Sequence, residues 1–138
     1  MRGSYTKMFA SILLPSLDRT FDTHYRARTE CNLAATALAI RWYQVEHNNQ
    51  FPKSLDELIP KYLPAVPIDY LDGKPIRYRA DGAKPMIWSV GQNEIDDGGS
   101  AESARKNGIV NGVYDRWGTK DAVVYLTRQP RPTTQPVP

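Results

Sequence analysis

The pattern of apolar and polar positions predicts one long helix in the first third of the chain. From Pro15 or Ser16 to about Asn48, residues at alternating spacings of four and three fall on one side of a helix. A proline suits the first turn, where its missing N–H costs nothing, and the Asn48-Asn49-Gln50 run favours a turn that ends the helix. The stripe consists of Leu17, Phe21, His24, Arg28, Cys31, Ala35, Leu38, Trp42 and Val45.

The two halves of this stripe differ in polarity. The segment "DRTFDTHYRARTE" is rich in charged residues, which predicts a solvated surface or a contact with a partner. The segment "NLAATALAIRWYQV" is apolar and contains several small residues that allow close packing. We therefore expect the half of the stripe from Cys31 to Val45 to be buried against another element.

A short second helix is expected in "FPKSLDELIPKYLPAVP". Ser54 and Glu57 have the spacing of a reciprocal capping box, and Pro60 limits the helix to a turn or two. Its apolar face consists of Leu55, Leu58 and Ile59.

Three short strands are predicted downstream. "IRYR" alternates apolar and basic residues after the Asp72-Gly73 turn, so Ile76 and Tyr78 should face the core. "MIWSV" follows a second turn and completes an antiparallel hairpin, and "AVVYL", residues 122–126, forms a third strand. These elements predict an α+β fold, with a long N-terminal helix packed on a small three- to four-stranded antiparallel sheet.

Length and composition indicate a single globular domain. A chain of 138 residues with 41% hydrophobic and 24% charged residues can bury one core and is not disordered over most of its length. We divide it into an irregular or apolar segment at residues 1–15, a folded domain at 16–127 and a Pro-rich flexible tail at 128–138.

Charge and cysteine content narrow the classes of function. The net charge of +3 comes from basic and acidic residues scattered along the chain, which does not support nucleic-acid binding. The single cysteine, Cys31, excludes an intramolecular disulfide and a four-thiolate zinc site. The apolar run at residues 8–14 is far shorter than the roughly 20 residues of a membrane-spanning helix.

The candidate chemistry lies in the long segment between the second and third predicted strands, residues 91–121. Hard oxygen ligands and neighbouring glycines suit a calcium ion, although no register matches an EF-hand. The alternative is that Asp96-Asp97-Gly98-Gly99 is a solvated turn. The oxygen-bearing side chains are Asn93, Glu94, Asp96 and Asp97, with Asp115 and Asp121 at the far end of the segment.

A catalytic role for the two adjacent aspartates is disfavoured. Neighbouring side chains rarely point the same way, and a glycosidase holds its carboxyl pair about 5–10 Å apart on rigid supports. The chain contains no H-E-x-x-H, no G-x-S-x-G and no glycine-rich phosphate loop. His24 and Cys31 lie about 10 Å apart along the helix, too far for a nucleophile–base pair. We therefore do not expect an enzyme.

The order of short motifs resembles a known family. Phe51-Pro52, Ser54-Leu55-x-x-Leu58, Pro67-x-Asp69 and Asp72-Gly73-Lys74-Pro75 follow an apolar helix and precede an aromatic strand and "SVGQNEIDDGG". In this order they resemble the periplasmic domain of the major, G-type pseudopilins of type II secretion. The resemblance covers about half of the chain, roughly Ala34 to Gly99.

The resemblance implies a pilin-like fold and a calcium site in the loop after the second strand, with Asn93, Asp96, Asp97 and Asp115 as ligand candidates. It also implies a non-enzymatic structural or interaction domain in the periplasm or another extracytoplasmic compartment. Such a domain meets protein partners, or further copies of itself, through the long helix. Because "MRGSYTKMFASILLP" replaces the spanning helix of that family, we expect membrane association of the full-length protein only through a segment not present in this chain.

A second hypothesis uses the same loop differently. The segment at residues 91–121, together with Trp117, would form the site of an extracellular ligand-binding or hydrolytic module acting on a polymer. A hydrolase needs a carboxylate with a raised pKa in a cleft, a feature that only a structure can reveal.

Overall fold

The structure, a computed structural model, describes residues 3–82, 84–91, 93–102 and 116–127, with side chains from Thr20 onward. The elements, in chain order, are helix α1 (Gly3–Glu46), 3-10 helix η1 (Leu55–Leu58), strand β1 (Arg77–Arg79), strand β2 (Met86–Val90), 3-10 helix η2 (Arg116–Gly118) and strand β3 (Asp121–Tyr125).

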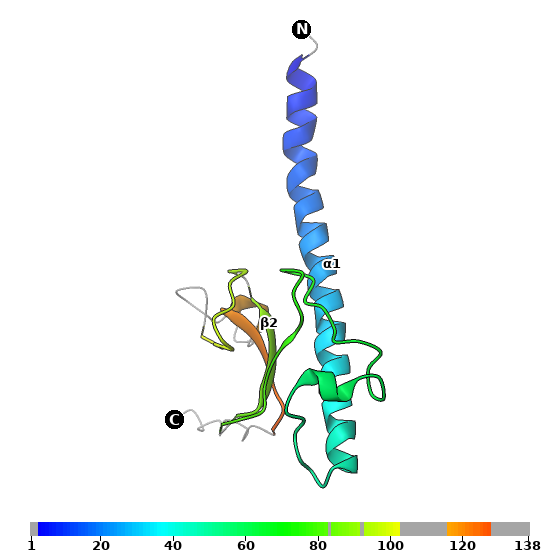
Figure 1. Ribbon diagram of the computed structural model, residues 1–138. Coiled ribbons are helices and arrows are strands. Elements are labelled where there is room, and N and C mark those ends of the chain that lie inside the picture. The colour runs from blue at the N-terminus through cyan, green and yellow to red at the C-terminus, as the bar shows by residue number, and fades with distance from the viewer. Residues whose placement is uncertain (1–2, 83, 92, 103–115, 128–138) are drawn as a thin grey trace, which may run out of the picture.

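The helix α1 is much longer than the sheet on which it packs. In Figure 1 the sheet lies beside the C-terminal part of α1, and the N-terminal part extends well beyond it. Strand β2 is central and pairs antiparallel with β1 on one side and β3 on the other. This arrangement confirms the predicted α+β fold. Within the described residues, no helix combines the length and apolar character needed to cross a bilayer.

The helix starts earlier than predicted and ends close to the predicted position. Because α1 begins at Gly3, Pro15 lies inside the helix and the predicted start at Pro15 or Ser16 is wrong. Proline removes a single backbone donor, and the helix-forming residues on both sides of it continue the helix. At the other end, Asn48 and Asn49 adopt left-handed backbone angles, with φ of 51° and 63°, just after Glu46.

The buried face of α1 is not the predicted one. Leu38, Trp42 and Val45 of the predicted stripe are 70%, 60% and 83% exposed. Cys31 and Ala35 of the same stripe are exposed as well. The expectation that this half of the stripe is buried is therefore wrong. The residues of α1 buried on the sheet side include Thr29, Leu33, Thr36, Ile40 and Gln44.

The reason is that this segment of α1 is apolar on two sides, so hydrophobic periodicity cannot choose between them. The buried side contains polar residues, and these find hydrogen-bond partners. The Thr36 hydroxyl donates to the carbonyl of Asn32 (2.7 Å), and the Gln44 side-chain amide donates to the carbonyl of Asn49 (3.3 Å). Since satisfied polar groups can be buried at little cost, this side can face the sheet.

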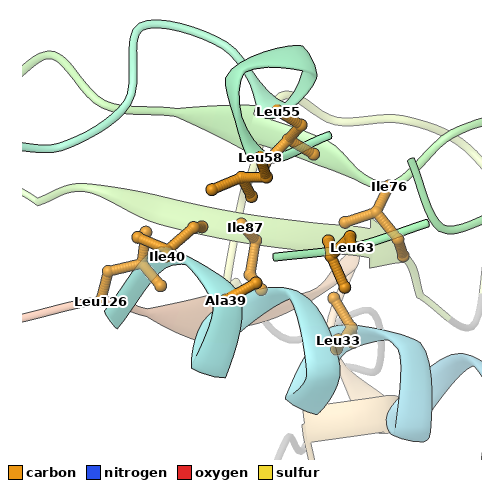
Figure 2. Packing of buried hydrophobic residues seen from close by; sticks show 9 residues of the cluster. All are labelled: Leu33, Ala39, Ile40, Leu55, Leu58, Leu63, Ile76, Ile87 and Leu126. Carbon is orange, nitrogen blue, oxygen red and sulfur yellow. The ribbon is translucent and has the colours of Figure 1, made fainter. Parts of the chain in front are cut away.

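One apolar core joins α1 to the sheet. Figure 2 shows nine of its side chains converging from α1, from η1 and the segments after it, from β2 and from the end of β3. Ile76 is buried in this core and Tyr78 packs against it, which confirms that both face inward. The nine residues are Leu33, Ala39, Ile40, Leu55, Leu58, Leu63, Ile76, Ile87 and Leu126.

The second helix is a single 3-10 turn, and its predicted capping box is wrong. Ser54 makes no side-chain capping bond to η1. The carboxylate of Glu57 instead accepts the backbone N–H of Lys53 (3.1 Å) and the hydroxyl of Tyr43 (2.9 Å). Glu57 is therefore used to fasten η1 to α1, while the two leucines of η1 are buried as expected.

Strand β2 is buried on both faces, including its one polar residue, Ser89. All five of its residues are buried. Ile87 points into the core shared with α1, whereas Met86 and Trp88 pack with Val123 of β3 on the opposite face. The predicted strands at 76–79, 86–90 and 122–126 agree with β1, β2 and β3 to within one residue at each end.

The choice of helix face is testable with two leucines of α1. We expect Leu33→Ala to lower the free energy of unfolding by about 2–5 kcal/mol, because it leaves a cavity in the core. Leu38→Ala should change it by less than about 0.5 kcal/mol, because Leu38 is largely exposed. Urea unfolding, at concentrations where both variants are monomeric, checks this. Equal losses would contradict the observed packing of α1.

A second prediction concerns the half-buried phenol of Tyr78. Its hydroxyl donates to the carbonyl of Pro52 (2.7 Å), and burial, followed by the charges of Glu57 and Tyr43, raises the pKa of Tyr78 to about 12. An unfolded tyrosine titrates near pH 10, so the folded state favours the neutral phenol. The resulting stability is complete below about pH 10 and is lost as the pH rises towards about 12.

We therefore expect the free energy of unfolding to fall over this alkaline window, and to fall less steeply in Tyr78→Phe, which cannot ionise. Chemical unfolding at a series of alkaline pH values measures the slope. Tyr25→Phe, which removes the hydroxyl of an exposed tyrosine, is the control. A slope unchanged by Tyr78→Phe would show that another group is responsible.

Candidate functional site

The residues after β2 fold back over the outer face of the sheet. Met86, Trp88 and Val123 form a small apolar cluster there, and Ala101 packs against it. Gly99 has a φ of +82°, and a Cβ at this position would lie 2.7 Å from the sulfur of Met86. Residues 99–101 are thus half-buried on the sheet, and their position requires a glycine at the point of closest approach.

The side chain of Asp121, the first residue of β3, binds the backbone of this loop. Its fully buried carboxylate accepts the N–H groups of Asp97 (3.2 Å), Gly99 (2.9 Å) and Ser100 (2.8 Å). Burial raises the pKa of Asp121, although the three N–H donors favour the charged form. The carboxylate expected at the far end of a cation cage is therefore occupied by backbone donors.

Gly91 fixes where the loop leaves β2. Its N–H donates to the carbonyl of Lys120 (2.8 Å), and a Cβ on Gly91 would lie only 2.2 Å from the carbonyl oxygen of Thr119. A side chain at this position would separate the end of β2 from the segment that leads into β3. The two ends of the long connection are therefore held in contact by a glycine.

Asp96 is turned towards the sheet and is fully engaged. One carboxylate oxygen accepts the indole N–H of Trp88 (2.9 Å) and the backbone N–H of Gly98 (3.1 Å). The other accepts the Nε–H of Arg77 (3.2 Å). Burial opposes ionisation, but these donors and the charge of Arg77 lower the pKa of Asp96 below its ordinary value.

Arg77 of β1 brings three carboxylates together. Its guanidinium is only 11% exposed and donates to Asp69 through Nη1 (2.7 Å), to Asp72 through Nη2 and to Asp96 through Nε. Burial opposes ionisation of Asp72, but the bonds from Arg77 and from the backbone N–H of Lys74 lower its pKa. We call these four residues, Asp69, Asp72, Arg77 and Asp96, the Arg77 cluster.

Asp69 connects the Arg77 cluster to the rest of the fold. Besides Arg77, its fully buried carboxylate accepts the backbone N–H of Val90 in β2 (3.0 Å) and of Leu71 (3.1 Å). The hydroxyl of Thr29 in α1 lies 3.5 Å from the same carboxylate and accepts the N–H of Tyr70 (3.0 Å). A buried carboxylate with this many donors is a structural ion pair whose partners are all satisfied.

Sequence reasoning missed the Arg77 cluster. Sequence patterns place Asp69 only in the Pro67-x-Asp69 motif and Arg77 only at a basic position of the alternating "IRYR" strand. The usable signal was the spacing of Asp69, Asp72-Gly73 and Arg77, because a glycine turn folds the two aspartates back onto the start of the next strand.

The predicted calcium ligands do not form a common site in the described part of the chain. Asn93 and Asp97 are bonded to each other, amide nitrogen to carboxylate oxygen (2.6 Å), while Asp96 binds Arg77 and Trp88. Asp115 lies outside the described residues. Over the ranges given above, no three acidic, histidine or cysteine side chains are placed to hold a metal ion. Asp96, Asp97 and Asn93 thus already take part in hydrogen bonds inside the domain.

The exposed side of α1 is a second candidate site. It carries a line of exposed residues at intervals of three and four, which place them on one side of the helix, and the large apolar members of this line are Phe21, Leu38, Trp42 and Val45. With about 100° per residue, this line lies on the side of α1 away from Leu33 and Ile40. We call it the α1 stripe, and its exposed members are Phe21, His24, Arg28, Cys31, Ala35, Leu38, Trp42 and Val45.

No family model, curated protein or solved structure matches the chain. Its function is therefore inferred from its own residues and their arrangement.

Two matched substitutions test whether the Asp121 carboxylate anchors the backbone of the loop. We expect Asp121→Asn to lower the free energy of unfolding by about 2 kcal/mol or more, because it leaves buried N–H donors without an acceptor. Asp97→Asn, the same change at an exposed carboxylate of the same loop, should cost less than about 1 kcal/mol. Urea unfolding measures both. Equal losses of unfolding free energy in the two variants would favour a cation bound by both carboxylates over anchoring of the backbone by Asp121.

Proposed function

We propose that this chain is a non-enzymatic structural and interaction domain of the pseudopilin type, which associates through α1 with the α1 of a second copy. The observation that carries the proposal is the α1 stripe, whose C-terminal half, from Cys31 to Val45, is apolar and is left exposed by the fold. The order of motifs between Phe51 and Pro75, followed by a sheet packed on a long helix, supports the pseudopilin type. The same resemblance supports an extracytoplasmic location.

The shape of the α1 stripe favours a helix as its partner. Alternating intervals of three and four average 3.5 residues, the repeat that keeps one seam facing a neighbouring helix. From Phe21 to Val45 the stripe is roughly 36 Å long, at 1.5 Å per residue. Its apolar part, from Cys31 to Val45, is about 21 Å long by the same rise and narrow, which matches a rod and not a compact ligand.

A second copy of the chain provides such a helix with the same spacing. The stripe faces away from the sheet, and Figure 1 shows α1 extending beyond the sheet, so two helices can meet along this side without contact between the sheets. The one cation in the stripe, Arg28, lies over the ring of Tyr70 (4.6 Å) and donates to its hydroxyl (3.2 Å). This contact draws the guanidinium towards the domain and away from the seam.

The alternative function, a ligand-binding or hydrolytic module at residues 91–121, is less well supported. Asp96 and Asp121 use both of their oxygens in bonds inside the domain. A carboxylate that acts on a substrate needs a free oxygen directed into a cleft. These two carboxylates therefore favour a structural role.

Cys31 provides a direct test, because it is the chain's one cysteine and lies in the α1 stripe. A parallel, in-register pair of helices brings the two Cys31 thiols together, so mild oxidation should yield a disulfide-linked dimer. The combined change Leu38→Ala and Trp42→Ala should reduce cross-linking and raise the dimer dissociation constant by tenfold or more, since it removes two apolar anchors of about 1 kcal/mol or more each.

Two controls sharpen this test. In Cys31→Ala combined with Ala34→Cys, the thiol moves off the stripe while staying exposed on α1, and cross-linking should decline. Ile95→Ala truncates an exposed apolar residue of the loop and should leave association unchanged. A chain that sediments as a monomer at all concentrations and does not cross-link through Cys31 would overturn the proposal.

A further inference from the structure

The loop after β2 is held by a positive charge that belongs to the protein itself. Every nitrogen of the Arg77 guanidinium donates to a carboxylate, and these carboxylates come from the turn before β1 and from the loop after β2. We propose that Arg77 is the resident cation of this loop, in the position where a divalent metal would otherwise balance the aspartates, and that the loop folds without calcium. This goes beyond the proposed self-association and does not depend on it.

The chemistry of arginine suits this role. A guanidinium stays protonated at any pH at which the protein is folded, and its planar set of N–H groups can serve several carboxylate oxygens at once. In the Arg77 cluster the cation is nearly buried and Asp69 is fully buried, so water does not screen their attraction. Lysine, with one ammonium, could not reach Asp69, Asp72 and Asp96 in the same geometry.

Further N–H groups bind other lone pairs of the cluster. Asp96 also accepts from Trp88 and Gly98, and Asp69 from Val90 and Leu71. Calcium requires about 6–8 oxygen ligands at 2.3–2.6 Å. To bind at Asp96 it would have to compete with these donors and lie next to a guanidinium whose Nε is 3.2 Å from the same carboxylate.

The second anchor of the loop works in the same way. Asp121 accepts three backbone N–H groups from residues 97–100, so this part of the loop is also organised by proton donors. Arg77 binds the loop at the side chain of Asp96, and Asp121 binds it at the backbone N–H of the next residue, Asp97. Together they hold the 96–100 segment on the sheet through hydrogen bonds and an ion pair.

The first experiment measures thermal melting of the full chain in calcium and in EGTA, and compares it with Asp96→Asn. We expect the melting temperature of the wild type to be the same in both solutions. Asp96→Asn should lower it by the same amount in both, because the lost contacts are to Arg77 and Trp88. A higher wild-type melting temperature in calcium, or a loss in Asp96→Asn confined to calcium, would overturn the proposal.

The second experiment tests the guanidinium with a matched pair in β1. Arg77→Lys keeps the charge but loses the planar set of donors, so it should melt well below the wild type or fail to fold. Arg79→Lys makes the same change two residues away, at an exposed arginine that lies over the Trp88 ring (5.8 Å) and donates to the Gly98 carbonyl (3.5 Å). Its melting temperature should stay near that of the wild type. Equal effects of the two substitutions would overturn the role of Arg77.

Discussion

The buried ion pair between Asp69 and Arg77 is the interaction on which the rest of this structure depends. Asp69 lies at the point where α1, the turn before β1 and the end of β2 meet, and it accepts a bond from the backbone of β2 and one from Arg77 of β1. A buried carboxylate must be paired, because its removal from water is costly. Each element that meets Asp69 is therefore fixed relative to the others.

The ion pair also explains how a sheet of three short strands is covered on both faces. On one face β2 meets α1 through an apolar core, which Figure 2 shows around Ile87. On the other face Arg77 reaches Asp96, and Asp121 holds the backbone of residues 97–100, so the loop covers Met86 and Trp88. The apolar core and the polar anchors act together, because the loop buries the outer face only while its anchors hold it.

The loop side of the sheet and the far side of α1 therefore differ in polarity and in how their side chains are bonded. On the loop side, Asp96 and Asp121 are bound by Arg77, Trp88 and backbone donors. The far side of α1 is apolar and exposed, with Leu38, Trp42 and Val45 directed away from the sheet. The proposed self-association along the helix would require no rearrangement of the sheet and loop, because the exposed side of α1 faces away from them.

The sequence by itself determined the elements: strand periodicity located β1, β2 and β3, Asn48 and Asn49 marked the end of α1, and the Asp72-Gly73 turn was recognisable from residue type. These features depend on local backbone preferences, which neighbouring residues set. Only the tertiary structure decided that Leu33 and not Leu38 faces the sheet, because α1 is apolar on both sides. It also decided that Asp96 meets Arg77, since partners 19 residues apart are chosen by packing and charge in three dimensions and leave no local pattern.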